Sequence, residues 1–371
     1  MRSDSEDHVV LYASDHGFGH AARMLALASR LAEEGYAVTL CAGAAVPMLR
    51  AALPFLKKPI EVRQASLDPG LVAKKGALDF DMQASKEVLS VWLSRLPHLV
   101  KAEADFLVSA KTTLVIADAP AAALLAAART GIAAVVCSNF TWLDMYAGRF
   151  GEAMDAALRD AYGAARFGLR LRLGRMALEG LSTVVDVDGV LARPPIRSRA
   201  LIREELLVKP DESMVGLGLG GSLDPALYDA IAASAPGRVV RLLSPSPDAV
   251  MGVAGAAHLH FPTITPDPQS YFGACDLVLA KAGYSTLAEA ALAGVPLCVF
   301  PLRNSPESVR LAADVEILGL GVSLFDEAAA IGALADPVGL IQAARRAFRG
   351  PMPDAAPLLV SVLRSEGLLT H

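Results

Sequence analysis

DLVLAKAGYSTLAEAALAGVPLCVFP, residues 276–301, is the stretch that decides the fold. Its apolar runs predict buried strands at 277–280 and 295–300, and the residues between them predict a turn at Gly283 and a helix from about residue 285. A strand–turn–helix–strand unit of this kind belongs to a parallel sheet. Its turn lies at the carboxyl edge of the strands, where open α/β folds bind ligands.

Several groups suited to a nucleotide diphosphate converge on this turn. Lys281 offers a cation, and Ser285 and Thr286 offer hydroxyls and backbone N–H groups at a helix start. Glu289 stands four residues after Ser285, on the same helical face, where a carboxylate can accept hydrogen bonds from a ribose diol. The spacing of Thr286 and Glu289 also fits a capping box, which needs no ligand. The two roles are compatible.

The nine residues from Lys281 to Glu289 resemble the donor-binding signature of GT-B glycosyltransferases. They are similar to the motif of the peptidoglycan N-acetylglucosaminyltransferases and, more loosely, to that of plant secondary-product glycosyltransferases. In those families the first position is an Arg or His near the phosphates and the last is the Glu that holds the ribose. The resemblance implies an α/β protein of GT-B architecture, with two Rossmann-like doubly wound parallel-sheet domains facing across a cleft.

Composition narrows the class of protein. The 371 residues suffice for two or three domains with substantial cores. A net charge of −5 argues against a nucleic-acid partner. The four cysteines are scattered without a C-x-x-C pair, so we expect neither a zinc site nor a disulfide framework. No signal peptide and no apolar run of ~20 residues is apparent, and we expect a cytoplasmic protein.

Strand-like runs alternate with helical patterns along most of the chain, which indicates repeated βαβ units. Strands are expected near residues 8–14, 37–42, 59–64, 114–117, 133–138, 183–187, 214–219, 238–243, 257–261, 276–280, 296–300 and 321–324. Helices are expected near 20–34, 44–53, 80–109 and 120–130, within 141–178, and at 337–348 and 355–366. We therefore expect an acceptor-side domain over 1–190, a proline-containing linker over 191–211 and a nucleotide-sugar domain over 212–350. The GT-B resemblance implies that 351–371 returns toward the first domain.

The loop after the first strand carries a second group of candidates. Gly17 and Gly19 permit a tight turn or a close backbone approach to a ligand. His20 follows at a helix start with its ring able to reach that ligand, although a capping or packed polar histidine would look the same. Asp118 ends a buried strand, and it is either a partner for such a histidine or a helix cap before Pro120.

The Gly19–His20 pair matches the first loop of GT-B transferases, where inverting plant-type enzymes use the His as general base and orient it with an Asp that ends a later strand. Asp118 fits that position. A sugar hydroxyl has a pKa far above 7, so its attack on an anomeric carbon needs a proton acceptor, with rate gains of ~10²–10⁴. The resemblance thus implies metal-independent, inverting transfer. We assign no metal site to the D-x-D patterns at 79–81 and 186–188.

Three segments are more closely similar to the transferase-like N-terminal region of plant arabinokinases and its bacterial stand-alone relatives. They are GFGHAAR (17–23), SNFTW (138–142) and KAGYST (281–286). Phe140 and Trp142 follow a strand, where they either stack on an acceptor sugar or pack in the core. The Arg-rich stretch 159–175 is interpreted as a solvated helix rather than a peripheral membrane surface.

A glycine-rich turn follows the strand near residue 215. Gly220, Gly221 and Ser222 match the turn that approaches the donor diphosphate in GT-B transferases, which implies a nucleotide sugar, expected to be UDP-linked, and no other cofactor. The Gln positions that hold the donor sugar in those families are absent from 302–309, where Asn304 and Glu307 are the polar candidates. Besides a transferase acting on a small-molecule acceptor, a nucleotide-sugar hydrolase, an epimerase and a non-catalytic nucleotide-sugar binder stay open.

Overall fold

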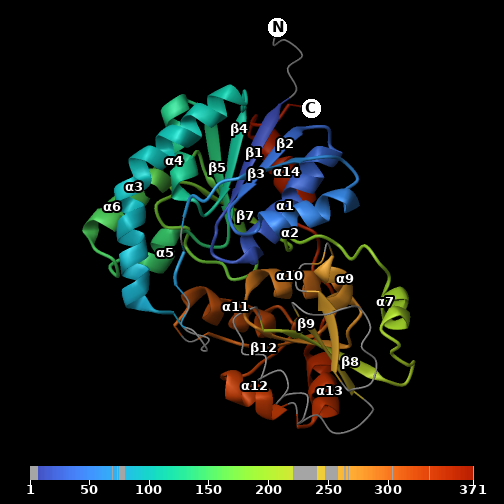
Figure 1. The fold of residues 1–371 in the computed structure, drawn as a ribbon. Coiled ribbons are helices and arrows are strands. Elements are labelled where there is room, and N and C mark those ends of the chain that lie inside the picture. The colour runs from blue at the N-terminus through green and yellow to red at the C-terminus, as the bar shows by residue number, and fades with distance from the viewer. Residues whose placement is uncertain are drawn as a thin grey trace. The chain divides into compact units, whose positions relative to one another are not determined.

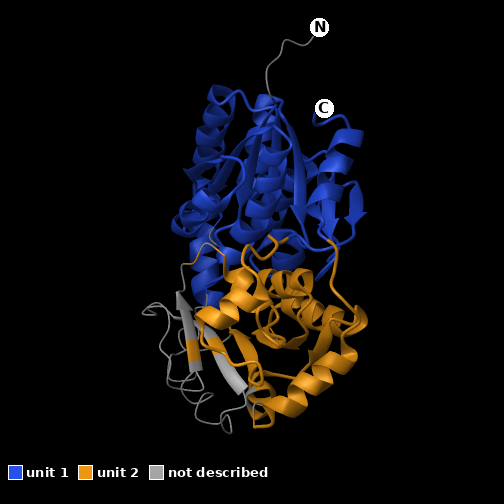
Figure 2. Cartoon of the chain, turned by 90° about the vertical axis from the view of Figure 1, so that its right-hand side faces the viewer, with its two compact units in different colours: residues 1–72, 81–191, 354–371 blue, residues 73–80, 192–353 orange. Residues whose placement is uncertain are grey.

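The computed structural model describes residues 7–68, 70–72, 74, 80–219, 240–246, 258–262, 265, 267–302, 304–333 and 335–370. The chain divides into two compact units, coloured separately in Figure 2. Unit 1 comprises residues 1–72, 81–191 and 354–371, and unit 2 comprises 73–80 and 192–353. Each unit is built on one parallel sheet.

The strands of unit 1 are β1 (His8–Ala13), β2 (Ala37–Ala42), β3 (Glu61–Gln64), β4 (Leu114–Asp118), β5 (Ala133–Ser138), β6 (Gly168–Leu171) and β7 (Val184–Val187). They lie in the order β3-β2-β1-β4-β5-β6-β7, and every neighbouring pair is parallel. The apolar residues of β4 and β5 are almost fully buried, as expected of strands covered on both faces. The order reverses between β1 and β4, so their carboxyl ends border the crevice where such sheets bind ligands.

The helices of unit 1 connect these strands and close the chain. They are α1 (Phe18–Glu33), α2 (Val46–Ala52), the 3₁₀ turn η1 (Leu53–Phe55), α3 (Met82–Ser109), α4 (Ala121–Thr130), α5 (Trp142–Tyr146), α6 (Glu152–Gly163) and α14 (Ala356–Ser365). The final helix, α14, packs against α1 although most of the chain separates them (Figure 1). Leu359 and Leu363 are fully buried, and Arg364 pairs with Glu34 at 2.6 Å.

The strands of unit 2 are β8 (Ser213–Gly218), β9 (Val240–Ser246), β10 (His258–Pro262), β11 (Leu277–Lys281), β12 (Leu297–Phe300) and β13 (Gly321–Ser323). Its described helices are α7 (Arg199–Glu205), α9 (Pro268–Gly273), α10 (Tyr284–Ala293), α11 (Pro306–Ile317), α12 (Glu327–Ala333) and α13 (Pro337–Ala347). The parallel order β10-β9-β8-β11-β12-β13 reverses between β8 and β11. The carboxyl ends of these two strands therefore mark the second ligand-binding edge.

The prediction of helix within 141–178 is wrong beyond Gly163, because β6 begins at Gly168. Leu169 and Leu171 are buried while Arg170 between them points to Asp186 of β7 at 2.6 Å, which is the period-two pattern of a strand. Arg170 pairs with Asp186 of β7, and Arg172 and Arg175 pair with Asp188, which follows that strand. The interpretation of a solvated Arg-rich helix is therefore wrong for residues 168–175. No helix in the part of the chain that the structure describes is long and apolar enough to cross a membrane.

Candidate functional site

The first candidate site lies in unit 1, at the ends of β1 and β4. Asp118 pairs with Ala13 in the parallel register, so it stands beside the residue that begins the β1–α1 loop. Gly17 precedes α1 with a φ of 86°, a conformation that favours glycine, and its N–H donates to the Asp15 carbonyl at 2.8 Å. Gly19 is the second residue of α1 and His20 the third. The tight turn expected here therefore depends on Gly17.

A buried arginine binds Asp118 in two places. Arg23, one helical turn after His20, donates from Nε to Asp118 Oδ2 at 2.5 Å and from Nη2 to Oδ1 at 2.6 Å. Its Nη1 donates to Asn139 Oδ1 at 2.7 Å, and Nη2 lies 3.2 Å from Ser138 Oγ. The exposed fraction is 2% for Arg23 and 0% for Asp118. This pair thus joins α1 to the ends of β4 and β5 in surroundings that exclude water.

Asp118 stays ionised in this environment. Burial by itself would raise the pKa of its carboxyl, but the charge of Arg23 and then of His20 outweighs burial and holds the pKa well below its usual range. A carboxylate of this kind can orient an imidazole and stabilise a proton on it.

The His20 ring faces this pair through Nδ1. Its Nδ1 lies 3.0 Å from Asp118 Oδ2 and 2.9 Å from Arg23 Nη2. Because Arg23 Nη2 has Ser138 Oγ as a further acceptor, Nδ1–H of His20 can donate to Asp118 while the arginine hydrogens remain bonded. In that tautomer Nε2 of His20 carries a lone pair. The structure thus brings the predicted residues His20 and Asp118 together.

The backbone after Asp118 is strained. Ala119 has a φ of 76°, which a residue with a side chain rarely adopts, and its carbonyl accepts from the Tyr162 hydroxyl at 2.7 Å. Pro120 occupies the cap position of α4, and no side chain caps that helix. The alternative that Asp118 is a helix cap is therefore wrong.

The aromatic residues after β5 form a packed wall behind His20. Phe140 and Trp142 are 0% and 2% exposed, so of the two alternatives left open for them the core interpretation holds and stacking on an acceptor does not. The Phe140 ring meets the His20 ring edge-on at 5.5 Å, and Trp142 stacks on Tyr146 at 4.8 Å. Rigid packing of this kind restricts the rotation of His20.

The second candidate site lies in unit 2, where β11 ends and α10 begins. Lys281 closes β11, and burial lowers the pKa of its ammonium group. The structure gives Lys281 no ion pair with a described residue. Gly283 occupies the N-cap position of α10, and this residue has no side chain with which to cap the N–H groups of the first turn. Thr286 is the third residue of the helix and therefore cannot be its cap. The capping box is therefore not formed, and Ser285 and Thr286 belong to the first turn.

Two strand ends and the start of α10 meet closely. Gly218 is the last residue of β8, and a Cβ at this position would lie 2.5 Å from Cγ2 of Thr286. Glycine therefore lets the end of β8 approach the helix start. Gly220, Gly221 and Ser222, which this loop carries, lie outside the described residues.

Glu289 is buried in α10 and 8% exposed. Burial raises the pKa of its carboxyl to about 7, against the opposing charge of Arg193. Arg193 precedes two prolines, and burial lowers the pKa of its guanidinium group. A buried carboxyl whose pKa lies near neutrality is a candidate for a binding or catalytic position.

The two other predicted site residues, Asn304 and Glu307, follow β12, in a region that is bonded to the turn before α10. Ser308 of α11 donates to the Ala282 carbonyl at 2.7 Å and accepts from Leu302 N–H at 2.9 Å, which ties the β12–α11 loop to the β11–α10 turn. Asn304 is exposed in that loop, and Glu307 lies in the first turn of α11.

Four polar residues were not predicted as site residues: Arg23, Asn139, Arg193 and Asp68, whose Oδ2 accepts from Trp142 Nε1–H at 2.5 Å. For Arg23 a signal exists, since it stands three residues after His20 on the same helical face. For Asp68 and Arg193 no local pattern exists, because the contacts that define their roles come from distant parts of the chain.

Comparison with known proteins shows a fold rather than an activity. No sequence model of a protein family matches the chain. A segment of 311 residues is 29% identical to L-arabinokinase of Arabidopsis thaliana; it takes in 81% of this chain and spans 29% of that protein.

Solved glycosyltransferases share the fold over nearly the whole chain. Arabidopsis thaliana UGT89C1 complexed with UDP has a TM-score of 0.64 at 15% identity, over 98% of this chain and 100% of that one. Spinosyn forosaminyltransferase SpnP has a TM-score of 0.63 at 15% identity, over 98% and 100%. Acinetobacter baumannii MurG has a TM-score of 0.55 at 18% identity, over 97% and 99%. The chain has the GT-B fold and is distantly similar to L-arabinokinase, as predicted.

Replacing Asp118 by Asn should strongly destabilise unit 1, because it leaves the Arg23 charge buried without a counter-charge. We expect a loss of about 3–5 kcal/mol in the free energy of unfolding. Both tryptophans, Trp92 and Trp142, belong to unit 1, so tryptophan fluorescence during urea unfolding reports on this unit.

Asp186→Asn is the matched control, since Asp186 pairs with Arg170 at the surface and should lose less than about 1 kcal/mol. If the two substitutions lowered the free energy of unfolding equally, the buried pair would contribute no more to stability than the surface pair, which would contradict the prediction.

Proposed function

We propose that this protein transfers a sugar from a nucleotide-diphosphate donor, a UDP-sugar, to a hydroxyl of a small acceptor, with inversion at the anomeric carbon. The observation that carries the proposal is His20 held against a buried, ionised Asp118 at the switch point of unit 1. The GT-B fold supports it, as does UDP in one structure that shares this fold.

Unit 2 would hold the donor. The diphosphate is proposed to bind the N–H groups of the first turn of α10 and the ammonium group of Lys281, since both favour negative charge. The Gly220–Ser222 turn is proposed to complete this contact. Glu289, five residues into the helix, would accept from the ribose hydroxyls. Asn304 and Glu307 are the polar groups proposed for the donor sugar.

Unit 1 would supply the base. The acceptor oxygen bonds to the anomeric carbon as the bond from that carbon to the diphosphate oxygen breaks, and the electron pair of the broken bond leaves with UDP. The hydroxyl proton passes to Nε2 of His20, whose Nδ1–H donates to Asp118. Asp118 thereby offsets the positive charge that forms on the imidazole. One displacement of this kind inverts the anomeric centre.

The binding of a UDP-sugar should strengthen as the pH rises through neutrality. Glu289 has a pKa of about 7 in the free protein, so below that pH the carboxyl is protonated and must lose its proton to accept both ribose hydroxyls. Linkage then predicts an affinity for UDP-glucose roughly tenfold higher at pH 8 than at pH 6. UDP-glucose is the suitable probe because its diphosphate diester does not titrate in this interval. Isothermal titration calorimetry measures the effect.

Glu289→Gln should bind more weakly and with no pH dependence in this range. Glu204→Gln, at an exposed position of α7, should behave as the wild type does. If the affinity of Glu289→Gln for UDP-glucose still depended on pH, the proposed contact between Glu289 and the ribose would be contradicted.

His20→Ala should lower transfer by about 10²–10⁴-fold while UDP-glucose still binds. Transfer is followed as UDP release with the most active acceptor from a panel of free sugars and sugar alcohols, L-arabinose included because of the similarity to L-arabinokinase. His98→Ala, at an exposed position of α3, is the control and should leave the rate unchanged. Equal turnover in wild type and His20→Ala would contradict the base, and UDP release of equal rate with water alone would identify a hydrolase.

A further inference from the structure

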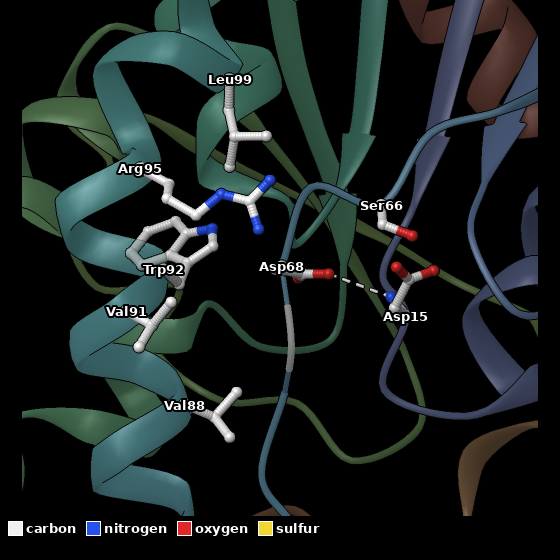
Figure 3. A pocket seen from close by; sticks show the side chains of 8 residues that line it. All are labelled: Asp15, Ser66, Asp68, Val88, Val91, Trp92, Arg95 and Leu99. Atoms are coloured by element: carbon white, nitrogen blue, oxygen red, sulfur yellow. Dashed lines mark hydrogen bonds between the residues drawn. The ribbon is translucent and has the colours of Figure 1, made fainter.

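A pocket of about 290 Å³ opens in unit 1 between α3 and the loop that follows β1 (Figure 3). One wall is α3, and the other is formed by Asp15 together with the segment that follows β3. The volume lies just below the ~300–1,000 Å³ typical of small-molecule sites, so the pocket suits a single molecule of small size.

The α3 wall is apolar with one cation. Val88, Val91, Trp92, Arg95 and Leu99 recur at helical spacing and line the pocket as one stripe. In Figure 3 the guanidinium group of Arg95 points into the pocket, across from the carboxylates. Arg95 makes no hydrogen bond or ion pair with any residue that the structure describes. Its N–H donors therefore face the space that a ligand would fill.

The opposite wall is acidic and rigid. The two tryptophans hold neighbouring residues of one segment, because Trp92 Nε1 donates to the Leu67 carbonyl at 2.6 Å and Trp142 Nε1 donates to Asp68 Oδ2 at 2.5 Å. Asp68 Oδ1 accepts from the Asp15 N–H at 3.0 Å.

Asp15 is fixed in turn by the Gly43 N–H at 2.6 Å, where any Cβ would collide with its carboxylate. The carboxylates are thus positioned before a ligand arrives.

We propose that this pocket binds a neutral polyol of about monosaccharide size. Burial raises the pKa of the Asp68 carboxyl, and its two oxygens already accept from the Asp15 and Trp142 N–H groups. The groups left to face a ligand are the positive Arg95, the negative Asp15 and the Ser66 hydroxyl, a balance that disfavours both an anionic and a cationic ligand. Arg95 offers donors, whereas Asp15 and Ser66 offer acceptors. Hydroxyl groups both donate and accept, so a sugar can satisfy both walls, and its C–H faces can pack on Val88 and Val91.

This ligand is the acceptor if the proposed transfer is correct, and that role rests on the proposed function. Trp142 connects the two places, since it bonds Asp68 at the pocket wall and its ring centre lies 6.4 Å from that of His20. The binding itself does not depend on transfer.

The test is titration calorimetry of D-glucose, L-arabinose and myo-inositol on the wild type and on two pocket variants. Arg95→Gln removes the unpaired cation and should weaken binding of the polyol that binds best at least tenfold. Val91→Trp should abolish binding by filling the pocket. Lys86→Gln removes an exposed charge from the same helix outside the lining and should leave the affinity unchanged. Thermal unfolding confirms that each variant is folded.

The anion D-glucuronate and the cation D-glucosamine test whether the ligand is neutral, and both should bind more weakly than D-glucose. Tighter binding of either, the lack of binding by all three polyols, or unchanged affinity in both pocket variants would overturn the inference. UDP-glucose is titrated into the same samples. Binding of UDP-glucose without polyol refutes only this pocket, and binding of polyol without UDP-glucose refutes only the proposed donor site.

Discussion

The buried ion pair between Arg23 and Asp118 is the constraint on which the rest of unit 1 depends. One guanidinium group satisfies a carboxylate at the end of β4 and reaches Ser138, the last residue of β5, and Asn139 after it, while its own helix follows β1. Three neighbouring strand ends are thereby held in register at the point where the strand order reverses. Burying two opposite charges is costly, and bonds to all their polar atoms are what make it tolerable.

The same pair sets the electrostatics around His20. The opposite charges of Arg23 and Asp118 offset each other in these dry surroundings. A proton on His20 adds one positive charge beside Arg23, and Asp118 compensates for it through the contact with Nδ1. Arg23 therefore fixes Asp118 in place but also competes with His20 for it.

Much of the fold follows from the sequence because it depends on local pattern. The buried strands β1, β4, β8, β11 and β12 are apolar runs that end in a turn, and the two switch points place the residues after them at ligand-binding edges. His20, Asp118, Lys281 and Glu289 are predicted because each stands at such an end or in the helix that follows it.

The predictions that are wrong share one cause: long-range contacts determine the structure at these positions. Gly168 to Leu171 alternates apolar and charged residues over only four positions, too few to distinguish a strand from a helix until β7 supplies acids for the arginines. Thr286 and Glu289 fit a capping box by spacing, but the chain already caps α10 at Gly283. Trp142 can be buried because its indole N–H donates to Asp68, a contact between distant parts of the chain that the local sequence does not show.

The central claim is that His20 accepts a proton at Nε2, and its tautomer tests that claim most directly. Nitrogen-15 NMR on protein labelled at histidine, with the His20 signals identified by their loss in His20→Ala, reports which ring nitrogen carries the proton. Above neutral pH the account predicts a protonated Nδ1, donating to Asp118, and an unprotonated Nε2. A proton on Nε2, with Nδ1 accepting from Arg23 at the 2.9 Å contact, would contradict it, because the nitrogen that must take the proton would already hold one.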